Sequence, residues 1–255
     1  MTKRALPALT LLAALIGWEA LVRLAQIPHY TLPAPSLVLQ TLSANFGSLA
    51  GSWWFTLKIT VGALALACAG GVLIASVFAL SRTLELALFP IAVVLQVTPV
   101  VAIAPLILIY VESTTAALLL CAWIVAFFPI LSNTVIGLRS ADANLRDLYR
   151  LYRATPWQRL RLLLVPSALP YFVAGLKVSG GLSLIGAVTA EMVAGAAGRE
   201  TGLASRILEA SFRTETPKMF AALLLLVLTG VLIFWSFEAL SRALLGRWHA
   251  SEQAD

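Results

Sequence analysis

The residues with the clearest capacity for chemistry are arginines gathered in the middle of an apolar chain. Six of them fall within a short stretch: Arg139, Arg146, Arg150, Arg153, Arg159 and Arg161. Only Asp142 and Asp147 offset their charge there. Guanidinium groups bind carboxylates and phosphates in a planar, two-pronged manner, so they are common on surfaces that meet a partner. We expect residues 139–170 to form a loop that is presented to a soluble partner on one side of a membrane.

Polar residues inside apolar stretches form a second candidate group. Glu191 is one of them, and an ionisable residue in a membrane span is by default a candidate for a transport path or gate. The competing interpretation is that Glu191 lies near the outer end of its span, hydrogen-bonded to a neighbouring helix. Gln96 and Asn133 could line a path, although polar side chains also join helices in lipid. Pro99 could bend a lining helix, because a proline leaves a backbone carbonyl without its donor.

Few residues in the chain could support covalent catalysis. His29 and His249 lie in opposite flanking regions, and Cys68 and Cys121 lie in uncharged runs with no CxxC motif. Paired catalytic carboxylates, an HExxH motif and a GxxxxGK(S/T) phosphate loop are all absent from the sequence. The sequence therefore argues against a membrane-embedded enzyme. We expect no catalytic residue, no metal site and no cofactor in this chain.

Composition indicates a protein of the lipid bilayer. Of the 255 residues, 60% are hydrophobic and 12% are charged, against roughly 25% charged in soluble domains. The net charge of +6 could indicate a nucleic-acid partner. However, the basic residues lie between apolar runs and not on one soluble face, which is typical of membrane topology. We expect a single transmembrane domain over residues 1–255, contacts with lipid, and no nucleic-acid partner.

The apolar runs predict an all-α, polytopic membrane protein with about six transmembrane helices. A span needs about 20 apolar residues. Uncharged runs of that order cover residues 59–81, 86–111, 113–138 and 219–237. Two further spans carry charges, namely residues 5–25 with Glu19, which we expect to be structural or interfacial, and residues 171–194 with Lys177 and Glu191. The prolines within residues 26–55 predict an extended outer loop.

Lysines and arginines are distributed unevenly between the two sides. With the N-terminus inside, the outer segments hold only Arg199, Arg206 and Arg213, interleaved with glutamates. The positive-inside rule then places both termini and residues 139–170 in the cytoplasm. The first apolar stretch resembles a signal peptide, but no clear cleavage site follows it. We therefore expect it to be retained as the first span.

The arginine-rich loop is predicted to contain two short helices. In the first, Arg146, Arg150 and Arg153 recur on one face, opposite an apolar face, and Asp147 can pair with Arg150. The second begins at Thr155, with Pro156 at the first helical position and Gln158 completing a capping box. Pro166 is expected to close it, and Pro170 to break or kink the chain as it re-enters the membrane.

The second short helix is predicted to be a docking element. Its apolar face, made of Trp157, Leu160 and Leu164, could bind a groove in a partner. Arg159 and Arg161 would then meet acidic or carbonyl groups of that partner. A capped, proline-closed helix is stiff enough to transmit a change of shape from a soluble motor to a membrane path.

This loop resembles the cytoplasmic EAA loop of the membrane subunits of ABC importers. The family pattern is Glu-Ala-Ala, three residues, Gly, nine residues, then Ile-x-Leu-Pro. With Pro166 at the final proline, Asp147 falls at the Glu position and Leu163 at the Ile position, although most identities are substituted. Arg153 stands in place of the glycine that permits a left-handed turn. We therefore expect the bend to be made at residues 154–156 instead.

The resemblance extends over nearly the whole chain. Residues 32–42, 96–110, 127–140 and 169–195 are similar to permeases of nitrate, sulfonate, taurine and thiamine-pyrimidine-precursor importers. That branch usually has Gly-Ile-Gly after the third span, where this chain has Val111-Glu112-Ser113. The resemblance implies a type I importer permease in a bacterial inner membrane.

The resemblance also implies a set of partners and a coupling surface. Two copies of the chain would form the path, an external binding protein would deliver the solute, and a separate cytosolic ABC ATPase dimer would bind ATP and Mg. The coupling residues would be Asp147, Arg150, Arg153, Thr155, Pro156, Trp157, Arg159 and Arg161. The cargo would be a sulfonate, nitrate, a small organic anion or a thiamine-pyrimidine-type precursor. The alternative is an ion-coupled secondary transporter or channel with no ATPase partner.

Overall fold

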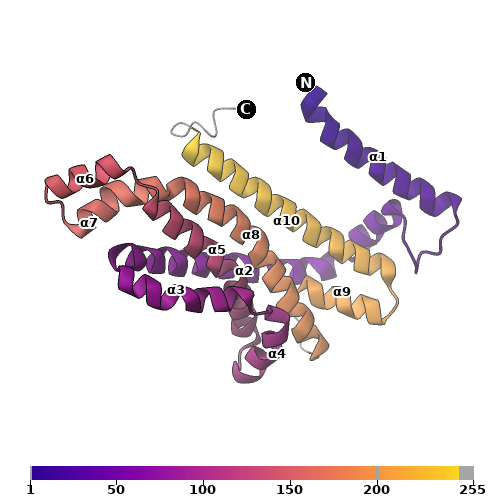
Figure 1. Ribbon diagram of the computed structural model, residues 1–255. Coiled ribbons are helices and arrows are strands. Elements are labelled where there is room, and N and C mark those ends of the chain that lie inside the picture. The colour runs from indigo at the N-terminus through magenta and orange to yellow at the C-terminus, as the bar shows by residue number, and fades with distance from the viewer. Residues whose placement is uncertain (1, 199–201, 247–255) are drawn as a thin grey trace.

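The computed structural model describes residues 2–198 and 202–246, and within them the chain is almost entirely helical (Figure 1). Five of the described helices are long and apolar enough to cross a membrane. A sixth span results if two bent helices, α3 and α4, are counted together. The prediction of an all-α polytopic protein with about six spans is confirmed. In chain order the elements are α1 (Thr2–Leu24), α2 (Pro35–Leu80), α3 (Arg82–Val97), α4 (Val100–Tyr110), α5 (Thr114–Arg139), α6 (Ala143–Leu151), α7 (Pro156–Arg159), the π-helical turn η1 (Leu160–Leu164), α8 (Val165–Ala196), α9 (Leu203–Phe212) and α10 (Thr216–Leu245).

The second helix is far longer than its apolar run. The predicted extended loop over residues 26–55 is wrong, because α2 begins at Pro35. Proline is well tolerated in a first helical turn, where its missing N–H has no helical partner. Glu19 of α1 supports this start, since its carboxylate accepts bonds from the backbone N–H of Ser36 at 3.0 Å and from its hydroxyl at 2.7 Å. At 46 residues, α2 is about 70 Å long, more than twice the hydrocarbon thickness.

The predicted single span over residues 86–111 is broken in the structure. Helices α3 and α4 meet at Thr98 and Pro99 with a bend of 99°. Pro99 occupies the N-cap position of α4 in an extended conformation, and the residue before a proline is itself driven out of the helical region. The expectation that Pro99 bends a helix is confirmed, and the bend divides the segment into two short helices.

The centre of the bundle is built from α2, α5 and α8. Small residues such as Ala122, Ala126 and Ala187 are completely buried there and let the helices approach closely. The Ser179 hydroxyl donates to the Ala126 carbonyl at 2.7 Å across the α5–α8 contact. A side chain at Gly175 would lie 2.8 Å from a carbonyl oxygen of α5, so this contact also requires glycine.

The second short helix of the loop does not end at Pro166, and that prediction is wrong. Helix α7, the turn η1 and α8 form one continuous run from Pro156 to Ala196, with Pro166 in the first turn of α8 and Pro170 inside it. The backbone N–H of Val165 bonds the Leu160 carbonyl five residues back, the signature of a π turn. This wider turn makes room for the proline ring, so the helix continues. In Figure 1 the α6–α7 hairpin and α9 lie at opposite ends of this run.

Candidate functional site

The hairpin of α6 and α7 is fixed by its own side chains. The Asp142 carboxylate caps α6 by accepting from the backbone N–H of Asn144 at 2.8 Å. The predicted capping box of α7 is confirmed: the N–H of Gln158 donates to the Thr155 hydroxyl at 3.2 Å, and the Gln158 side chain accepts from the N–H of Thr155 at 2.8 Å. The hairpin therefore has a defined shape before any partner binds.

The turn between the two helices is made at Arg153. Its φ angle is +53°, in the left-handed region that a glycine would normally occupy. The expectation that residues 154–156 would make the bend is therefore wrong. The N–H of Ala154 bonds the Tyr149 carbonyl at 3.0 Å, which closes the turn around Arg153. Arg153 thus adopts a conformation that glycine takes more readily, and it adds a positive charge at the tip.

The tip of the hairpin exposes large apolar side chains. Trp157 is 65% exposed and Tyr152 is 80% exposed. Between the two helices lies a cleft of about 300 Å³, lined by Leu148, Tyr149, Tyr152, Ala154, Gln158 and Leu162. Leu160 and Leu164, which were expected to extend the docking face of Trp157, are instead buried in the protein's own core. The exposed apolar surface of the hairpin is therefore its tip and the adjoining cleft.

The arginines of the loop divide into two groups. Arg153 and Arg161 are exposed. Arg146, Arg150 and Arg159 line a hollow between the hairpin and the bundle, which we call the arginine pocket. The predicted pairing of Arg150 with Asp147 is present at 3.1 Å, with both side chains largely exposed. Three arginines of the loop thus face the protein's own helix ends.

Glu191 lies at the other end of α8 and is completely buried. Its carboxylate accepts from the Thr56 hydroxyl of α2 at 3.0 Å and from the backbone N–H of Ala204 at 3.1 Å. The N–H of Leu203 in turn donates to the Thr56 hydroxyl at 2.9 Å. The first N–H groups of α9 are thus capped by two other helices, because the residue before α9 is Gly202, which has no side chain to do so.

The space around this cap is filled. A side chain at Gly202 would collide with both Thr56 and Glu191. The Ser205 hydroxyl also donates to the Glu191 carbonyl at 3.2 Å. Glu191 therefore fits the interpretation of an acid hydrogen-bonded to neighbouring helices, and its carboxylate faces no open path in this structure. A role in gating stays a prediction.

The other predicted path residues are not brought together with Glu191. Gln96 and Pro99 are exposed around the break between α3 and α4. Asn133 is half-buried in α5, where its amide donates to the Pro129 carbonyl at 2.8 Å and its side chain packs against Gly175 of α8. Asn133 thus joins helices in this structure.

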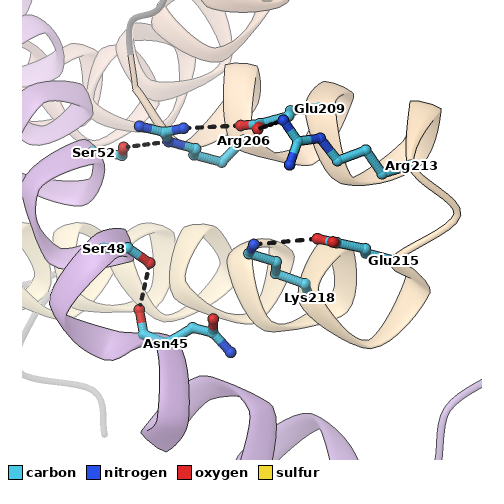
Figure 2. A network of polar contacts seen from close by, with 8 residues as sticks. All are labelled: Asn45, Ser48, Ser52, Arg206, Glu209, Arg213, Glu215 and Lys218. Carbon is cyan, nitrogen blue, oxygen red and sulfur yellow. Dashed lines mark hydrogen bonds and ion pairs between the residues drawn. The ribbon is translucent and has the colours of Figure 1, made fainter.

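A polar network covers the α9 end of the bundle (Figure 2). Arg206 donates to the Ser52 hydroxyl at 3.2 Å and contacts Glu209 at 2.8 Å, and Arg213 contacts Glu209 at 2.9 Å. Close by, Lys218 and Glu215 pair at 3.2 Å. The hydrogen bond from Arg206, together with the nearby positive charges, lowers the pKa of the Glu209 carboxyl below its ordinary value. Arg206 and Arg213, two of the arginines that the sequence assigns to the outer side, thus belong to this network, whereas the third, Arg199, lies outside the described residues.

One intramembrane charge pair was not predicted. The ammonium of Lys177 in α8 lies 2.9 Å from the carboxylate of Glu238 in α10, and Arg242 contacts the same carboxylate at 3.3 Å. The predicted span over residues 219–237 stops just before Glu238, whereas α10 continues to Leu245. Lys177 lies in an otherwise apolar span, and a charge in such a span usually has a partner of opposite charge. The sequence therefore contained a sign that another helix supplies an acid.

The chain matches known transport proteins over most of its length. The model of the family described as "Binding-protein-dependent transport system inner membrane component" matches residues 67–246. The riboflavin transport system permease protein RibX of Chloroflexus aurantiacus is 36% identical over 246 residues, which cover 95% of this chain and 89% of RibX. The formylaminopyrimidine transport permease protein ThiX of Halalkalibacterium halodurans is 31% identical, with 94% of each chain covered.

Solved structures share the fold. A chain of the MetNI methionine ABC transporter superposes with a TM-score of 0.60 at 20% identity, covering 76% of this chain and 95% of that one. A chain of an amino acid ABC transporter gives a TM-score of 0.61 at 17% identity, with 82% and 97% covered. Together with the spans described above, the full-length relatives identify the molecule. The chain belongs to the family of inner membrane components of binding-protein-dependent transport systems and is the transmembrane subunit of an ABC importer.

Proposed function

We propose that the α6–α7 hairpin is the element through which a separate cytosolic ABC ATPase drives this importer. The observation that carries the proposal is the unbroken helix from Pro156 to Ala196. Its first turn is the capped tip with the exposed Trp157, and its far end holds the Glu191 cap of α9. A partner that moves the tip therefore moves a segment about 60 Å long.

The two ends of the helical run from Pro156 to Ala196 suit a mechanism in which the permease switches between two conformations. At the tip, the cleft between α6 and α7 and the exposed Trp157 and Tyr152 offer an apolar surface to a groove. At the other end, Glu191 and Thr56 hold the start of α9 by a small number of hydrogen bonds. Binding energy at the tip would shift the balance between the present arrangement at α9 and an alternative one.

We expect the transport path to form between two copies of the chain. Helix α8 packs against α2, α4, α5, α9 and α10, yet one stripe along it is exposed. The stripe contains Val178, Ile185 and Met192, with Gly181 opening onto empty space. A central helix with a bare stripe suits a second copy of the chain, with the path formed where the two copies meet. Gln96 and Pro99, exposed at the break between α3 and α4, are proposed to contribute to its lining.

The proposed coupling role sets the orientation of the chain in the membrane and the partner on each side. The hairpin and both termini would face the cytoplasm of a bacterial inner membrane, and α9 would face an external binding protein. ATP and Mg would be bound by the ATPase partner and not by this chain. The ion-coupled transporter considered as an alternative has no support from the relatives, which are named as transport permeases of the same kind.

The proposed cargo is a small nitrogen heteroaromatic compound. The near-full-length relatives above 30% identity include permeases named for riboflavin and for formylaminopyrimidine, both of which contain a pyrimidine ring system. The permeases named for nitrate cover only about half of this chain. Uptake of radiolabelled riboflavin, formylaminopyrimidine and nitrate, measured with the cognate binding protein and ATPase, tests this choice. Transport of nitrate alone would contradict it.

Co-purification tests the docking proposal. Trp157→Ala removes an exposed apolar side chain at the tip, so the protein should keep its thermal stability but retain at least tenfold less ATPase. The matched control is Phe212→Ala, which removes another largely exposed aromatic side chain, at the far end of the molecule. It should retain the ATPase fully. Equal retention by the two variants would show that the tip is not the docking element.

A further inference from the structure

The arginine pocket lies apart from the apolar tip and cleft on which the proposed docking rests. Its volume is about 220 Å³, and five α-helices and the turn η1 contribute to it. Its charged groups are Arg82 and Glu85 of α3, Arg139 of α5, Arg146 and Arg150 of α6, and Arg159 of α7. Its floor is apolar and includes Phe78 and Leu138, close to the ends of α2 and α5.

The charges around the pocket do not balance. Glu85, whose side chain is 9% exposed, is paired with both Arg82 and Arg139. Asp147 pairs with Arg150. Arg146 and Arg159 are half-buried and have no acidic partner within the part of the chain that the structure describes. Half-burying guanidinium groups at one hollow is unfavourable without a counter-ion, so the pocket is built to receive an anion.

The shape and position of the pocket indicate which anion. The apolar floor lies where two spans end, at Leu80 and Arg139, which is the level of lipid headgroups. A ring of cations above an apolar floor matches a phosphate with acyl chains below it, and basic pockets between helices at this level bind anionic headgroups. The pocket also lies on a different face of α6 from the cleft at the hairpin tip. A docked partner at the tip would leave it accessible from the membrane.

We propose that the arginine pocket binds the phosphate headgroup of an anionic lipid in the leaflet beside the coupling hairpin. The headgroup fastens α6 and α7 to the ends of α2, α3 and α5. The hairpin is then held at a fixed height above the membrane, whether or not the ATPase is bound. This site is independent of the docking surface, so it can be tested on the permease alone.

Native mass spectrometry of the purified full-length permease, without ATPase, tests the proposal. Phosphatidylglycerol and phosphatidylcholine are titrated separately, and a third arm adds inorganic phosphate to protein that holds phosphatidylglycerol. We expect selective retention of phosphatidylglycerol. The double variant Arg146→Gln, Arg159→Gln should weaken that retention roughly 30-fold, because each basic residue near the surface contributes a factor of about five. The variant Arg146→Lys, Arg159→Lys keeps the charge and should stay within about threefold of the unmodified protein.

The matched control is Arg153→Gln, Arg161→Gln, which removes the same charge from exposed positions outside the pocket. It should retain phosphatidylglycerol within about threefold. An equal loss in both Gln double variants would mean diffuse surface attraction and would overturn the site. Retention of phosphatidylglycerol no better than of phosphatidylcholine would overturn it too. If inorganic phosphate displaced phosphatidylglycerol at equal concentration, the lipid assignment would be wrong. If the Gln variant of the pocket kept phosphatidylglycerol but lost the ATPase in the co-purification assay described above, the arginines would serve the partner instead.

Discussion

The hydroxyl of Thr56 and the carboxylate of Glu191 meet at 3.0 Å, and together they cap a helix to which neither belongs. Thr56 lies in α2 and Glu191 in α8, while the N–H groups they hold open α9. Glu19 of α1 caps the start of α2 in the same manner through Ser36. Acids placed in apolar helices thus satisfy the N-termini of neighbouring helices, where their charge also complements the helix dipole.

The first prediction concerns the close packing around Gly202, next to this cap. Gly202→Ala should destabilise the protein by about 1–3 kcal/mol, because the new methyl group collides with Thr56 and Glu191. Thermal unfolding of the purified protein measures the change. Gly51→Ala is the control, since nothing lies within 4 Å of a side chain there. An unchanged unfolding temperature for Gly202→Ala would show that α9 does not depend on this close packing.

The second prediction separates the charge of Glu191 from its hydrogen bonds. Glu191→Gln keeps an acceptor oxygen for Thr56 and Ala204, so the importer should assemble normally but transport at a reduced rate. Glu191→Ala leaves those buried donors unsatisfied and should cost about 1–3 kcal/mol of stability. Uptake assays beside thermal unfolding measure both effects. Wild-type uptake by the Gln variant would confine Glu191 to a structural role.

The third prediction is a dependence on pH at the α9 surface. Arg206, with Arg213 and Lys218 nearby, lowers the pKa of Glu209 in the folded protein. The stabilisation is therefore fully present above the unfolded pKa of about 4.3 and is lost as the pH falls through the lower, folded value. Glu209→Gln should be less stable than the unmodified protein at pH 7, and the difference should shrink below about pH 4.

Unfolding temperatures across that range check the sign of the effect. Glu112→Gln, which removes an exposed acid from the turn between α4 and α5, is the control and should leave the pH profile unchanged. A difference between Glu209→Gln and the unmodified protein that widened with acid would contradict the account. High salt should reduce the effect, because the ion pairs are partly exposed.

The fourth prediction concerns the charge pair between α8 and α10. Glu238→Leu leaves Lys177 and Arg242 without their shared acid, whereas Lys177→Met leaves Glu238 paired with Arg242. The first substitution should therefore cost roughly 1–3 kcal/mol and the second less. The double variant should recover part of the loss, because only Arg242, whose side chain is largely exposed, then lacks its partner. Equal and additive losses would show that the pair contributes nothing.

The span that the sequence predicts best has a helix-capping residue at its start and an arginine at its end. Residues 113–138 were expected and α5 runs from Thr114 to Arg139, with the Ser113 hydroxyl accepting from the N–H of Ala116 at 3.3 Å. A cap residue at one end and an arginine at the other are readable without knowledge of the rest of the molecule. The capping box at Thr155 was predictable for the same reason.

The sequence did not predict features that depend on tertiary contacts or on whether a helix continues through a proline. Pro99 was expected to bend a helix but not to divide the predicted span, because the uncharged run over residues 86–111 has no periodicity that marks an end. Pro166 ends a helix in most local contexts but is absorbed here by a π turn. Arg153 takes a left-handed conformation that no sequence rule assigns to arginine. Glu191 was singled out correctly as unusual, but only the position of α9 shows what its carboxylate binds.

Thiol labelling of the hairpin tip tests the central claim most directly. Trp157→Cys is introduced with Cys68 and Cys121 replaced by alanine, and a membrane-impermeant maleimide is applied to right-side-out and inside-out vesicles. The account predicts labelling only in inside-out vesicles, and protection when the ATPase is bound. Labelling from the outside, or equal labelling with and without the ATPase, would contradict it.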